Sequence, residues 1–220
     1  MTGPDLRPPA FRPVADRAVL VEFAAQPSPQ AEAAVRALDH ALAERPCPGL
    51  VEAIPAFVNL CVVFDPLMTD HDRVTGHLRG LLSQPAPQRS APALHQVDIT
   101  YDGPDLPAVA RARGLTPDQV IALHQAAEFH VVMYGFAPGY AYLAGLPEAL
   151  ALDRKPAPQR GVPAGSVIIA GRQCLITTLT MPTGWWIIGR SATPILTGDP
   201  ARPFLFDPGD RVRFRQAGHG

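Results

Sequence analysis

The sequence predicts an α+β chain with two domains, a small layered domain followed by a β-rich barrel or sandwich. Strand and helix patterns alternate in the first third of the chain, whereas short β-type runs separated by Gly and Pro fill the C-terminal half. Between them, residues 83–93 are rich in Pro, Ala and Ser and have no periodic apolar pattern, which is typical of a linker. We therefore expect domains at residues 1–85 and 95–220, with a linker at 86–94.

The N-terminal domain is predicted to have the element order β-α-β-β-α. Its elements are a strand at Ala18–Phe23, a helix capped by Ser28 that ends near Pro46, strands at Leu50–Ile54 and Phe57–Phe64, and a helix capped by Thr69 that runs to about Leu82. Two helices of this length need a shared apolar surface to cover. We therefore expect a small antiparallel sheet with both helices on one face.

The second domain is predicted to begin with a strand at Val97–Tyr101 and two short helices. The second helix has clear start chemistry, with Thr116 as N-cap, Pro117 at the first helical position and Gln119 completing a capping box. Gly114 suits the C-terminus of the preceding helix, because glycine readily adopts the left-handed conformation found there. These signals place a pair of helices directly after the first strand of the domain.

Five short β-type runs follow, which is the pattern of a barrel or sandwich. They are FHVVMY, SVIIA, CLITTL, WWIIG and RVRFR, at residues 129–134, 166–170, 174–179, 185–189 and 211–215. The stretch between the first two runs shows little periodicity, and loops this long inside a compact domain are usually functional. Because this stretch contains Phe136, Tyr140, Tyr142 and Leu143, we interpret it as an ordered binding loop.

Composition argues against several classes of protein. A net charge of -1 without a long Lys/Arg run disfavours nucleic acid as a partner, because such binding depends on neutralising phosphates. The three cysteines, Cys47, Cys61 and Cys174, have no CxxC spacing, so we expect a reduced, cytoplasmic chain. The N-terminal residues lack the features of a signal peptide, and no apolar run is long enough to cross a membrane. We therefore expect neither export nor a membrane partner.

Familiar catalytic motifs are missing from the sequence. It contains no G-x-S-x-G elbow, no phosphate loop, no H-E-x-x-H metal helix and no dinucleotide fingerprint. His124 and His130 stand on either side of a helix-to-strand change, so nothing local brings both to one metal ion, and we expect both to be structural. We expect no metal site and assign no catalytic residue.

Loops built from Gly, Pro and a few polar residues are the candidate binding elements. They are GFAPGYAYL, QRGVPAGSV, AGRQC and TGWWIIGRS, at residues 135–143, 159–167, 170–174 and 183–191. Glycine lets the backbone approach a ligand, and Arg160, Arg172 and Arg190 can bind carboxylate or phosphate oxygens through two N–H groups. Taken one at a time, these loops are as readily explained as turns between short strands.

Trp185 and Trp186 are neighbours in a predicted strand, so their side chains should point to opposite faces. We expect one to be core and the other to be exposed at an interface or substrate face, unless a loop of the chain covers it.

At these loops the sequence resembles the family of carboxyltransferase subdomains C and D, which includes the B-type subunit of 5-oxoprolinase, allophanate hydrolase subunit 1 and the sporulation kinase inhibitor. The matching blocks are Tyr134–Leu143, Val162–Val167, Ala170–Gln173, Gly184–Trp185 with Ile188–Arg190, and Pro208–Phe214. The resemblance implies an N-terminal α+β domain followed by a cyclophilin-like β-barrel. The sequence departs from the family after Gln173, where Cys174–Thr178 replaces the usual Thr-Gly-Ile-Tyr-Pro.

The resemblance also implies a function and partners. It implies the B-type subunit of an ATP-dependent 5-oxoprolinase complex, inactive alone, that opens 5-oxoproline to glutamate. Its implied partners are a ring-opening A-type subunit together with a carboxyltransferase-like C-type subunit. ATP with magnesium is expected at the level of the complex. The alternatives are a subunit that works with allophanate hydrolase or urea carboxylase, and a regulatory protein of the kinase-inhibitor type.

The predicted substrate-binding residues come from the Gly- and Pro-containing loops. They are Phe136, Pro138, Gly139, Tyr142, Arg160, Gly165, Ser166, Gln173, Trp185 and Arg190. Among them, Arg160, Gln173 and Arg190 are predicted to orient a substrate carboxylate and to stabilise a developing oxyanion.

Overall fold

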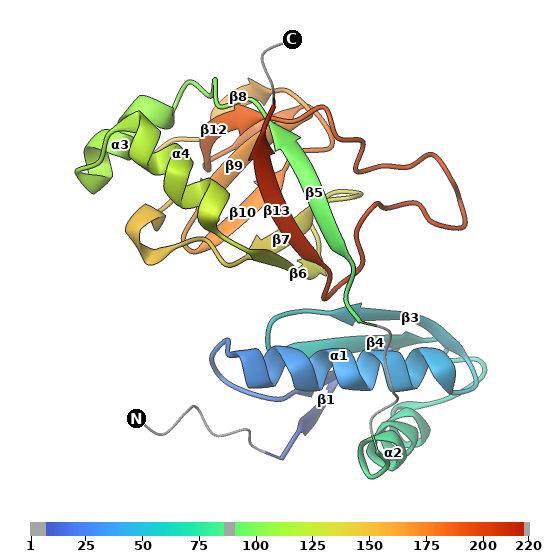
Figure 1. Cartoon of the computed structure of the whole chain (residues 1–220). Helices are drawn as coiled ribbons and strands as arrows, with labels where there is room; N and C mark the ends of the chain where they lie inside the picture. Colours follow the sequence, from blue (N-terminus) through green and yellow to red (C-terminus); the bar gives the residue numbers. More distant parts are fainter. Residues whose placement is uncertain (1–7, 86–90, 218–220) are drawn as a thin grey trace. The chain divides into compact units, whose positions relative to one another are not determined.

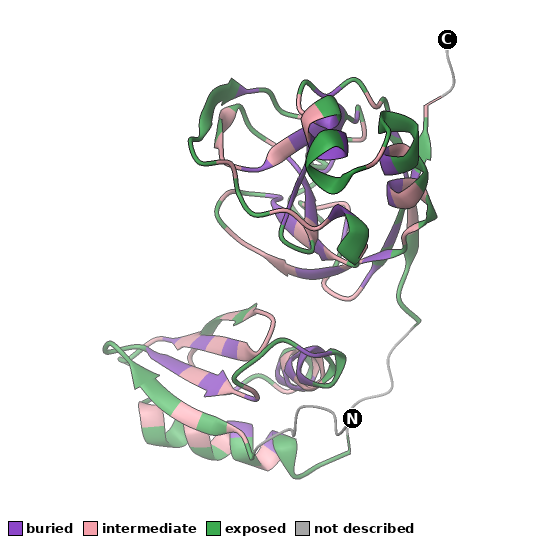
Figure 2. Ribbon diagram, turned by 90° about the vertical axis from the view of Figure 1, so that its left-hand side faces the viewer, coloured by how far each residue is buried: buried purple, intermediate pink, exposed green. Residues whose placement is uncertain are grey.

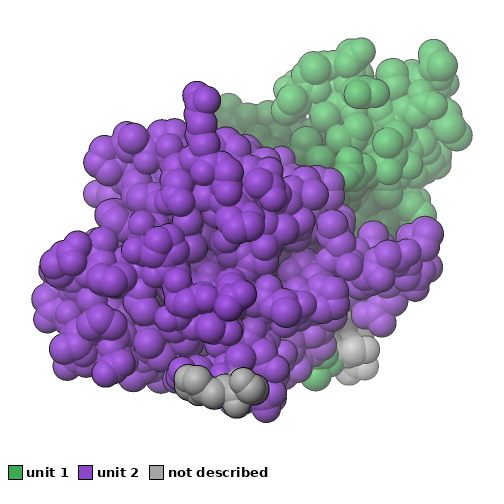
Figure 3. Space-filling model, turned by 90° about the horizontal axis from the view of Figure 1, so that it is seen from above, with its two compact units in different colours: residues 1–91 green, residues 92–220 purple. Residues whose placement is uncertain are grey.

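The computed structural model describes residues 8–85 and 91–217, and the chain divides into two compact units, residues 1–91 and 92–220 (Figure 3). Residues 86–90 of the predicted linker lie outside the described residues. Leu94, which was predicted to belong to the linker, is already the first residue of a strand of the second unit.

The first unit is a four-stranded antiparallel sheet with two helices (Figure 1). Its elements are β1 (Ala10–Val14), β2 (Ala18–Glu22), α1 (Pro29–Glu44), β3 (Leu50–Pro55), β4 (Asn59–Phe64) and α2 (His71–Leu82), and the strand order is β1-β2-β4-β3. All five predicted elements are confirmed. Strand β1 was missed because it is largely exposed and contains Pro13, which suits an edge position but weakens the strand pattern.

Both helices of the first unit pack on one face of its sheet, as predicted. Burial alternates along the strands (Figure 2), and Val19 and Val21 of β2 lie opposite Val62 and Leu60 of β4 on the covered face. These residues share one core cluster with apolar side chains of α1 and α2. Alternate burial is the expected result when only one face of a sheet is covered.

Side-chain caps fix where these two helices begin. Ser28 Oγ accepts a hydrogen bond from the backbone N of Ala31 at 3.1 Å, as predicted. The predicted cap of α2 was wrong by one residue, because Asp70, not Thr69, accepts from a helix N–H, that of Arg73 at 2.9 Å.

The second unit is a seven-stranded sheet curled into a barrel, with two helices and a small two-stranded sheet. Its elements are β5 (Leu94–Ile99), α3 (Leu106–Arg113), α4 (Pro117–Ala126), β6 (Phe129–Tyr134), β7 (Ala141–Ala144), the 3-10 turn η1 (Glu148–Leu150), β8 (Gln159–Val162), β9 (Ser166–Ala170), β10 (Gln173–Ile176), β11 (Met181–Thr183), β12 (Trp186–Arg190) and β13 (Arg211–Gln216). The order in the large sheet is β12-β9-β10-β7-β6-β13-β5, and β8 pairs with β11. The predicted barrel is thereby confirmed.

The two outer strands of the large sheet meet and complete the barrel. Thr100 and Arg190 exchange both backbone hydrogen bonds, at 2.8 and 2.9 Å. Beyond this bridge, Gly103 N donates to Ile188 O, and Asp105 N donates to Ile187 O. We call this row of contacts the barrel seam. This seam pairs the segment that follows β5 with β12 and so covers part of the edge that would otherwise remain unpaired at β12.

The helix signals of the second unit are confirmed in detail. Thr116 and Gln119 form both hydrogen bonds of a capping box at the start of α4. Gly114 ends α3 in the left-handed conformation, with φ of 67°. Figure 1 shows α3 and α4 together beside the barrel, where Val109 and Val120 join the barrel core.

The prediction that residues 134–166 form one long irregular loop was partly wrong. This stretch contains β7, η1 and β8. Each of these elements has only three or four residues, which is too short for the periodicity of a strand or helix to be recognised.

Replacing Gly189 with alanine should destabilise the second unit by about 1–3 kcal/mol through overpacking. A Cβ at Gly189 would lie 2.4 Å from Thr100 O in the barrel seam. Urea unfolding followed by tryptophan fluorescence measures this loss, because both tryptophans, Trp185 and Trp186, belong to this unit. Gly184→Ala is the matched control, since its Cβ meets nothing closer than 3.8 Å. Equal stability of the two variants would contradict the role of the seam.

Candidate binding site

An aromatic pocket lies beside the barrel strands β9 and β10 and is the first candidate site. It has a volume of about 110 Å³ and is lined by Phe136, Tyr140, Tyr142, Arg154, Ile168, Leu175, Pro182, Thr183, Gly184 and Trp185. Ile168 and Leu175 belong to an apolar cluster separate from the main barrel core, and Trp185 joins them there. The pocket therefore has an apolar floor supplied by the outward-facing residues of the strands.

Aromatic rings form the walls of the aromatic pocket. Tyr142 and Trp185 meet edge to face with ring centroids 5.9 Å apart, and the rings of Phe136 and Tyr140 are 5.7 Å apart. Tyr140 and Trp185 are buried, whereas Phe136 is 73% exposed. Such walls suit a flat or cyclic ligand.

Phe136 holds an unusual backbone conformation beside the pocket. Its φ is 70°, in the left-handed region that favours glycine. A large exposed side chain on a strained backbone gains nothing for folding, and such strain concentrates at binding and catalytic sites. Phe136 is therefore a functional candidate on structural grounds as well as from its place in the predicted binding loop.

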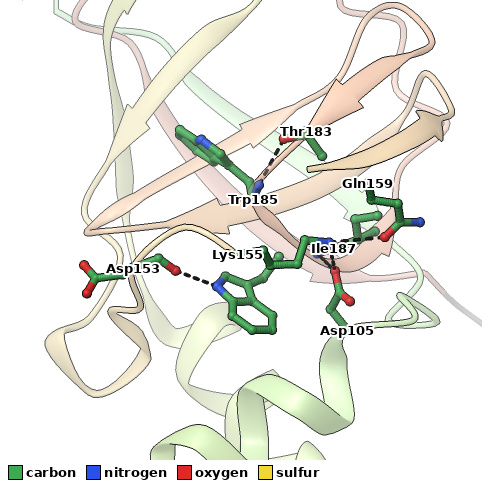
Figure 4. A network of polar contacts seen from close by, with 8 residues as sticks. Asp105, Asp153, Lys155, Gln159, Thr183, Trp185 and Ile187 are labelled. Carbon is green, nitrogen blue, oxygen red and sulfur yellow. Dashed lines mark hydrogen bonds and ion pairs between the residues drawn. The ribbon is translucent and has the colours of Figure 1, made fainter. Parts of the chain in front are cut away.

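The only charged side chain in the lining of the aromatic pocket is Arg154, and Figure 4 shows the contacts of its two chain neighbours, Asp153 and Lys155. The carbonyl of Asp153 accepts a hydrogen bond from Trp186 Nε1 at 2.7 Å, and Lys155 Nζ lies 2.7 Å from Asp105 Oδ2. Asp105 Oδ2 also accepts from the backbone N of Ile187. The guanidinium carbon of Arg154 lies over the ring of Trp185, at 5.9 Å from its centre, within the range of a cation–π contact.

A second hollow, of about 270 Å³, lies where loops meet at one end of β9, β10 and β12. We call it the hydroxyl hollow, and its lining is Ala164, Gly165, Thr177, Thr178, Ser191, Ala192, Thr193, Pro194, Ile195 and Leu196. Its hydroxyl groups are engaged: Thr177 donates to Pro163 O, Thr178 to Pro138 O, and Ser191 to Asp98 O. The hollow contains no charged side chain, so its hydroxyls serve mainly to hold loops together.

The structure brings some of the predicted site residues together. Phe136, Tyr142 and Trp185 share the aromatic pocket. Gly165 lines the hydroxyl hollow, and Ser166 follows it, buried, with its hydroxyl on Pro163 O.

Two further predicted residues of this group border the hydroxyl hollow. The backbone of Gly139 packs against Leu196 and Thr178, and Pro138 offers its carbonyl to Thr178. The ten predicted residues therefore do not all line a single hollow.

The three predicted carboxylate-orienting residues line neither hollow. Arg160 is exposed on β8. Gln173 pairs with Ala144 and Ala170 at the start of β10, away from the end where Thr177 lies. Arg190 pairs with Asp102, with 2.6 Å between Nε and Oδ2.

The sequence did not indicate Arg154, and of the two alternatives for the second tryptophan, exposure was the wrong one. Arg154 lies between polar residues in an irregular stretch, and no pattern in the sequence relates it to Trp185. Trp186 is not exposed: it is half-buried, packs against the barrel core and donates to Asp153 O. The alternative that a loop of the chain covers the second tryptophan is therefore the correct one.

A cysteine and a histidine in contact inside the barrel form no catalytic pair. His124 is completely buried, with Cys174 Sγ 3.6 Å from Nε2 and Tyr101 Oη 2.8 Å from Nδ1. Burial lowers the pKa of His124 to about 3 and raises the pKa of the Cys174 thiol, so neither group is charged at neutral pH. A protonated thiol without access to solvent is a poor nucleophile. The structural role predicted for His124 is confirmed.

The part of the chain that the structure describes contains no group of three or more His, Cys, Asp or Glu residues arranged to hold a metal ion. In the same residues, no helix is long and apolar enough to span a bilayer.

The buried His124 predicts a pH dependence of stability. Since its pKa falls from 6.5 to about 3 on folding, the unfolded chain takes up the proton first as the pH drops. The imidazole's contribution to the unfolding free energy is thus complete above pH 6.5 and is lost toward pH 3, by up to about 1.4 kcal/mol per pH unit. Urea unfolding of the wild type and His124→Gln between about pH 7 and pH 4.5 should show a shallower slope for the variant. Parallel slopes would contradict the prediction.

Comparison with known proteins gives extensive matches. The family described as "Carboxyltransferase domain, subdomain C and D" matches residues 9–206. The B-type subunit of 5-oxoprolinase from Bacillus subtilis (strain 168) is 33% identical over 218 residues, which are 90% of this chain and 89% of that protein. The B-type subunit of 5-oxoprolinase from Escherichia coli O157:H7 is 38% identical over 173 residues, 76% of this chain and 78% of that protein.

Solved structures share the fold. The crystal structure of TTHA0988 matches with a TM-score of 0.83 and 38% identity, covering 93% of this chain, which in turn spans 41% of that longer chain. The Kluyveromyces lactis urea amidolyase matches with a TM-score of 0.74 at 18% identity, covering 97% of this chain and 15% of its own, and this match bears on the fold alone.

Proposed function

This chain belongs to the family of carboxyltransferase domains, subdomains C and D, and we propose that it is the B-type subunit of an ATP-dependent 5-oxoprolinase complex that opens 5-oxoproline to glutamate. Two curated relatives that are named as this subunit of 5-oxoprolinase align with most of the chain. The names of these relatives supply the substrate class. The chemistry of the two hollows indicates whether this subunit binds the substrate or reacts with it.

The proposal is carried by one observation: the two hollows contain groups that can bind a ligand but no group that can act as nucleophile or base in opening a lactam. Their linings offer aromatic rings, hydroxyls and one arginine, and no His, Cys, Asp, Glu or Lys. Opening a lactam requires a nucleophile and proton transfer at the amide, which these groups do not supply at neutral pH. A chain of this kind positions a substrate while another subunit provides the reacting groups, so we propose that it is inactive alone.

The described residues do not fit ATP with magnesium. The sequence has no phosphate loop, and its only lysine, Lys155, is engaged by Asp105. One arginine in a pocket of about 110 Å³ cannot hold a triphosphate. We therefore assign the binding of ATP to another subunit of the complex.

The partners in the proposal are a ring-opening A-type subunit together with a carboxyltransferase-like C-type subunit. The chain spans 41% of the TTHA0988 chain, so more than half of that protein has no counterpart in this sequence. A separate subunit that supplies such a counterpart is consistent with the naming of the curated relatives as subunits. The three cysteines are free, which supports the cytoplasmic location included in the proposal.

Reconstitution tests the proposed function. Glutamate release from 5-oxoproline with ATP and magnesium should require all three subunits, and omission of this chain should lower turnover at least tenfold. Allophanate serves as the alternative substrate in the same assay. Strong turnover by the isolated chain, or turnover of allophanate but not of 5-oxoproline by the complex, would overturn the proposal.

A further inference from the structure

We propose that the aromatic pocket is a binding site for a small ring-containing carboxylate, with Arg154 as the group that receives the carboxylate. The ligand class follows from the pocket itself. The identification of this ligand as 5-oxoproline, a five-membered lactam bearing one carboxylate, rests on the proposed function.

The charge of Arg154 is the first argument for this site. Among the described residues, Arg154 has no carboxylate partner, as is also the case for Arg111, Arg160 and Arg202, whereas Arg172 pairs with Glu148, Arg190 with Asp102, and Arg211 and Arg213 with Glu128. Arg154 is also the only charged side chain in the pocket lining. An anionic ligand in the pocket would supply Arg154 with the carboxylate partner that the described residues do not provide.

The position of Arg154 is the second argument. Its guanidinium carbon lies 5.9 Å from the centre of the Trp185 ring, so the ring and the charge face the same small space. The backbone on both sides of Arg154 is held, because Asp153 O accepts a hydrogen bond from Trp186 Nε1 (Figure 4) and Lys155 N donates one to Gly184 O at 2.7 Å. A segment that is held in advance loses less conformational entropy on binding than a freely moving one.

Size and shape give the third argument. A cavity of roughly 150 Å³ accommodates benzene in another protein, so a pocket of about 110 Å³ that opens to solvent suits one small ring. The edge-to-face pair of Tyr142 and Trp185 offers aromatic surface to such a ring. A nucleotide base with its ribose and phosphates is too large for this space.

The pocket also has a polar group for a ligand carbonyl. Thr183 Oγ1 accepts a hydrogen bond from the backbone N of Trp185 at 3.1 Å. Its own hydroxyl hydrogen stays available to donate, since the described residues show no acceptor for it. Arg154 for a carboxylate and Thr183 for a carbonyl, both in the lining of the pocket, match the polar groups of a cyclic amide that carries a carboxylate.

Nuclear magnetic resonance of the isolated chain tests the inference with an internal control. The chain has two tryptophans: the Trp185 ring lines the pocket, whereas the Trp186 indole N–H is bound to Asp153 O. Titration with 5-oxoproline should shift the indole N–H signal of Trp185 and leave that of Trp186 nearly unchanged. The lactam 2-pyrrolidinone, which lacks the carboxylate, should bind at least tenfold more weakly.

Variants at Arg154 make the test specific. Arg154→Gln should weaken binding of 5-oxoproline roughly ten- to a hundredfold, because a hydrogen-bonded charge pair is lost. Arg154→Lys should recover part of the affinity, since it keeps the charge without the two-pronged geometry. Arg111→Gln, which replaces an exposed arginine of α3 that lines neither hollow, is the matched control and should bind as the wild type does. An unchanged Trp186 signal confirms that each variant is folded.

The outcomes separate this inference from the proposed function. If 5-oxoproline fails to bind but pyrrole-2-carboxylate or benzoate binds in an Arg154-dependent way, the carboxylate site stands and its assignment to 5-oxoproline fails. If no carboxylate shifts the Trp185 signal, or if Arg154→Gln binds as well as the wild type, the inference is wrong even where the reconstituted complex is active.

Discussion

The carboxylate of Asp105 is the interaction on which the candidate site depends. It accepts hydrogen bonds from the backbone N of Ile187 at 2.8 Å and from Lys155 Nζ at 2.7 Å, and both ends of this ion pair are largely buried. Asp105 also donates its own N–H to Ile187 O at the end of the barrel seam. One side chain therefore joins the start of α3, strand β12 and the segment that carries Arg154. A buried carboxylate needs such partners, since leaving it unpaired costs several kcal/mol.

The arrangement gives the barrel unit a binding surface without reacting groups. The residues with shifted pKa values near the core, His124 and Cys174, are sealed inside the barrel, where burial keeps both uncharged. The charged group that faces the pocket is an arginine, which does not exchange protons at neutral pH. This division between a closed core and a pocket of aromatic and cationic groups suits a subunit that orients a substrate for chemistry supplied elsewhere in a complex.

The sequence predicted those features that depend on local chemistry. The capping box of Thr116 and Gln119, the left-handed Gly114 and the Ser28 cap of α1 follow from neighbouring residues, and all are present. The one-residue error at the start of α2 arose because Thr69 and Asp70 are both good caps. Strand β1 was missed because an exposed edge strand with a proline has no apolar alternation.

The sequence could not predict features that depend on contacts across the fold. The grouping of Phe136, Tyr142 and Trp185 was anticipated from their loops, but the place of Arg154 depends on Lys155 meeting Asp105, fifty positions earlier in the chain. Similarly, Arg190 was expected at a substrate, and its pairing with Asp102 follows from the barrel seam that brings Thr100 and Arg190 together. Long-range pairing of this kind leaves no periodic signal in one sequence.

The central claim is that the Asp105–Lys155 pair positions Arg154 for a carboxylate ligand. A double-mutant cycle on the affinity for 5-oxoproline tests it most directly, because residues that act through one another have effects that are not additive. Lys155→Met should weaken binding roughly tenfold in the wild-type background and less than about twofold when Arg154 is already glutamine. Equal losses in the two backgrounds would contradict the claim, since Lys155 would then act on the ligand independently of Arg154.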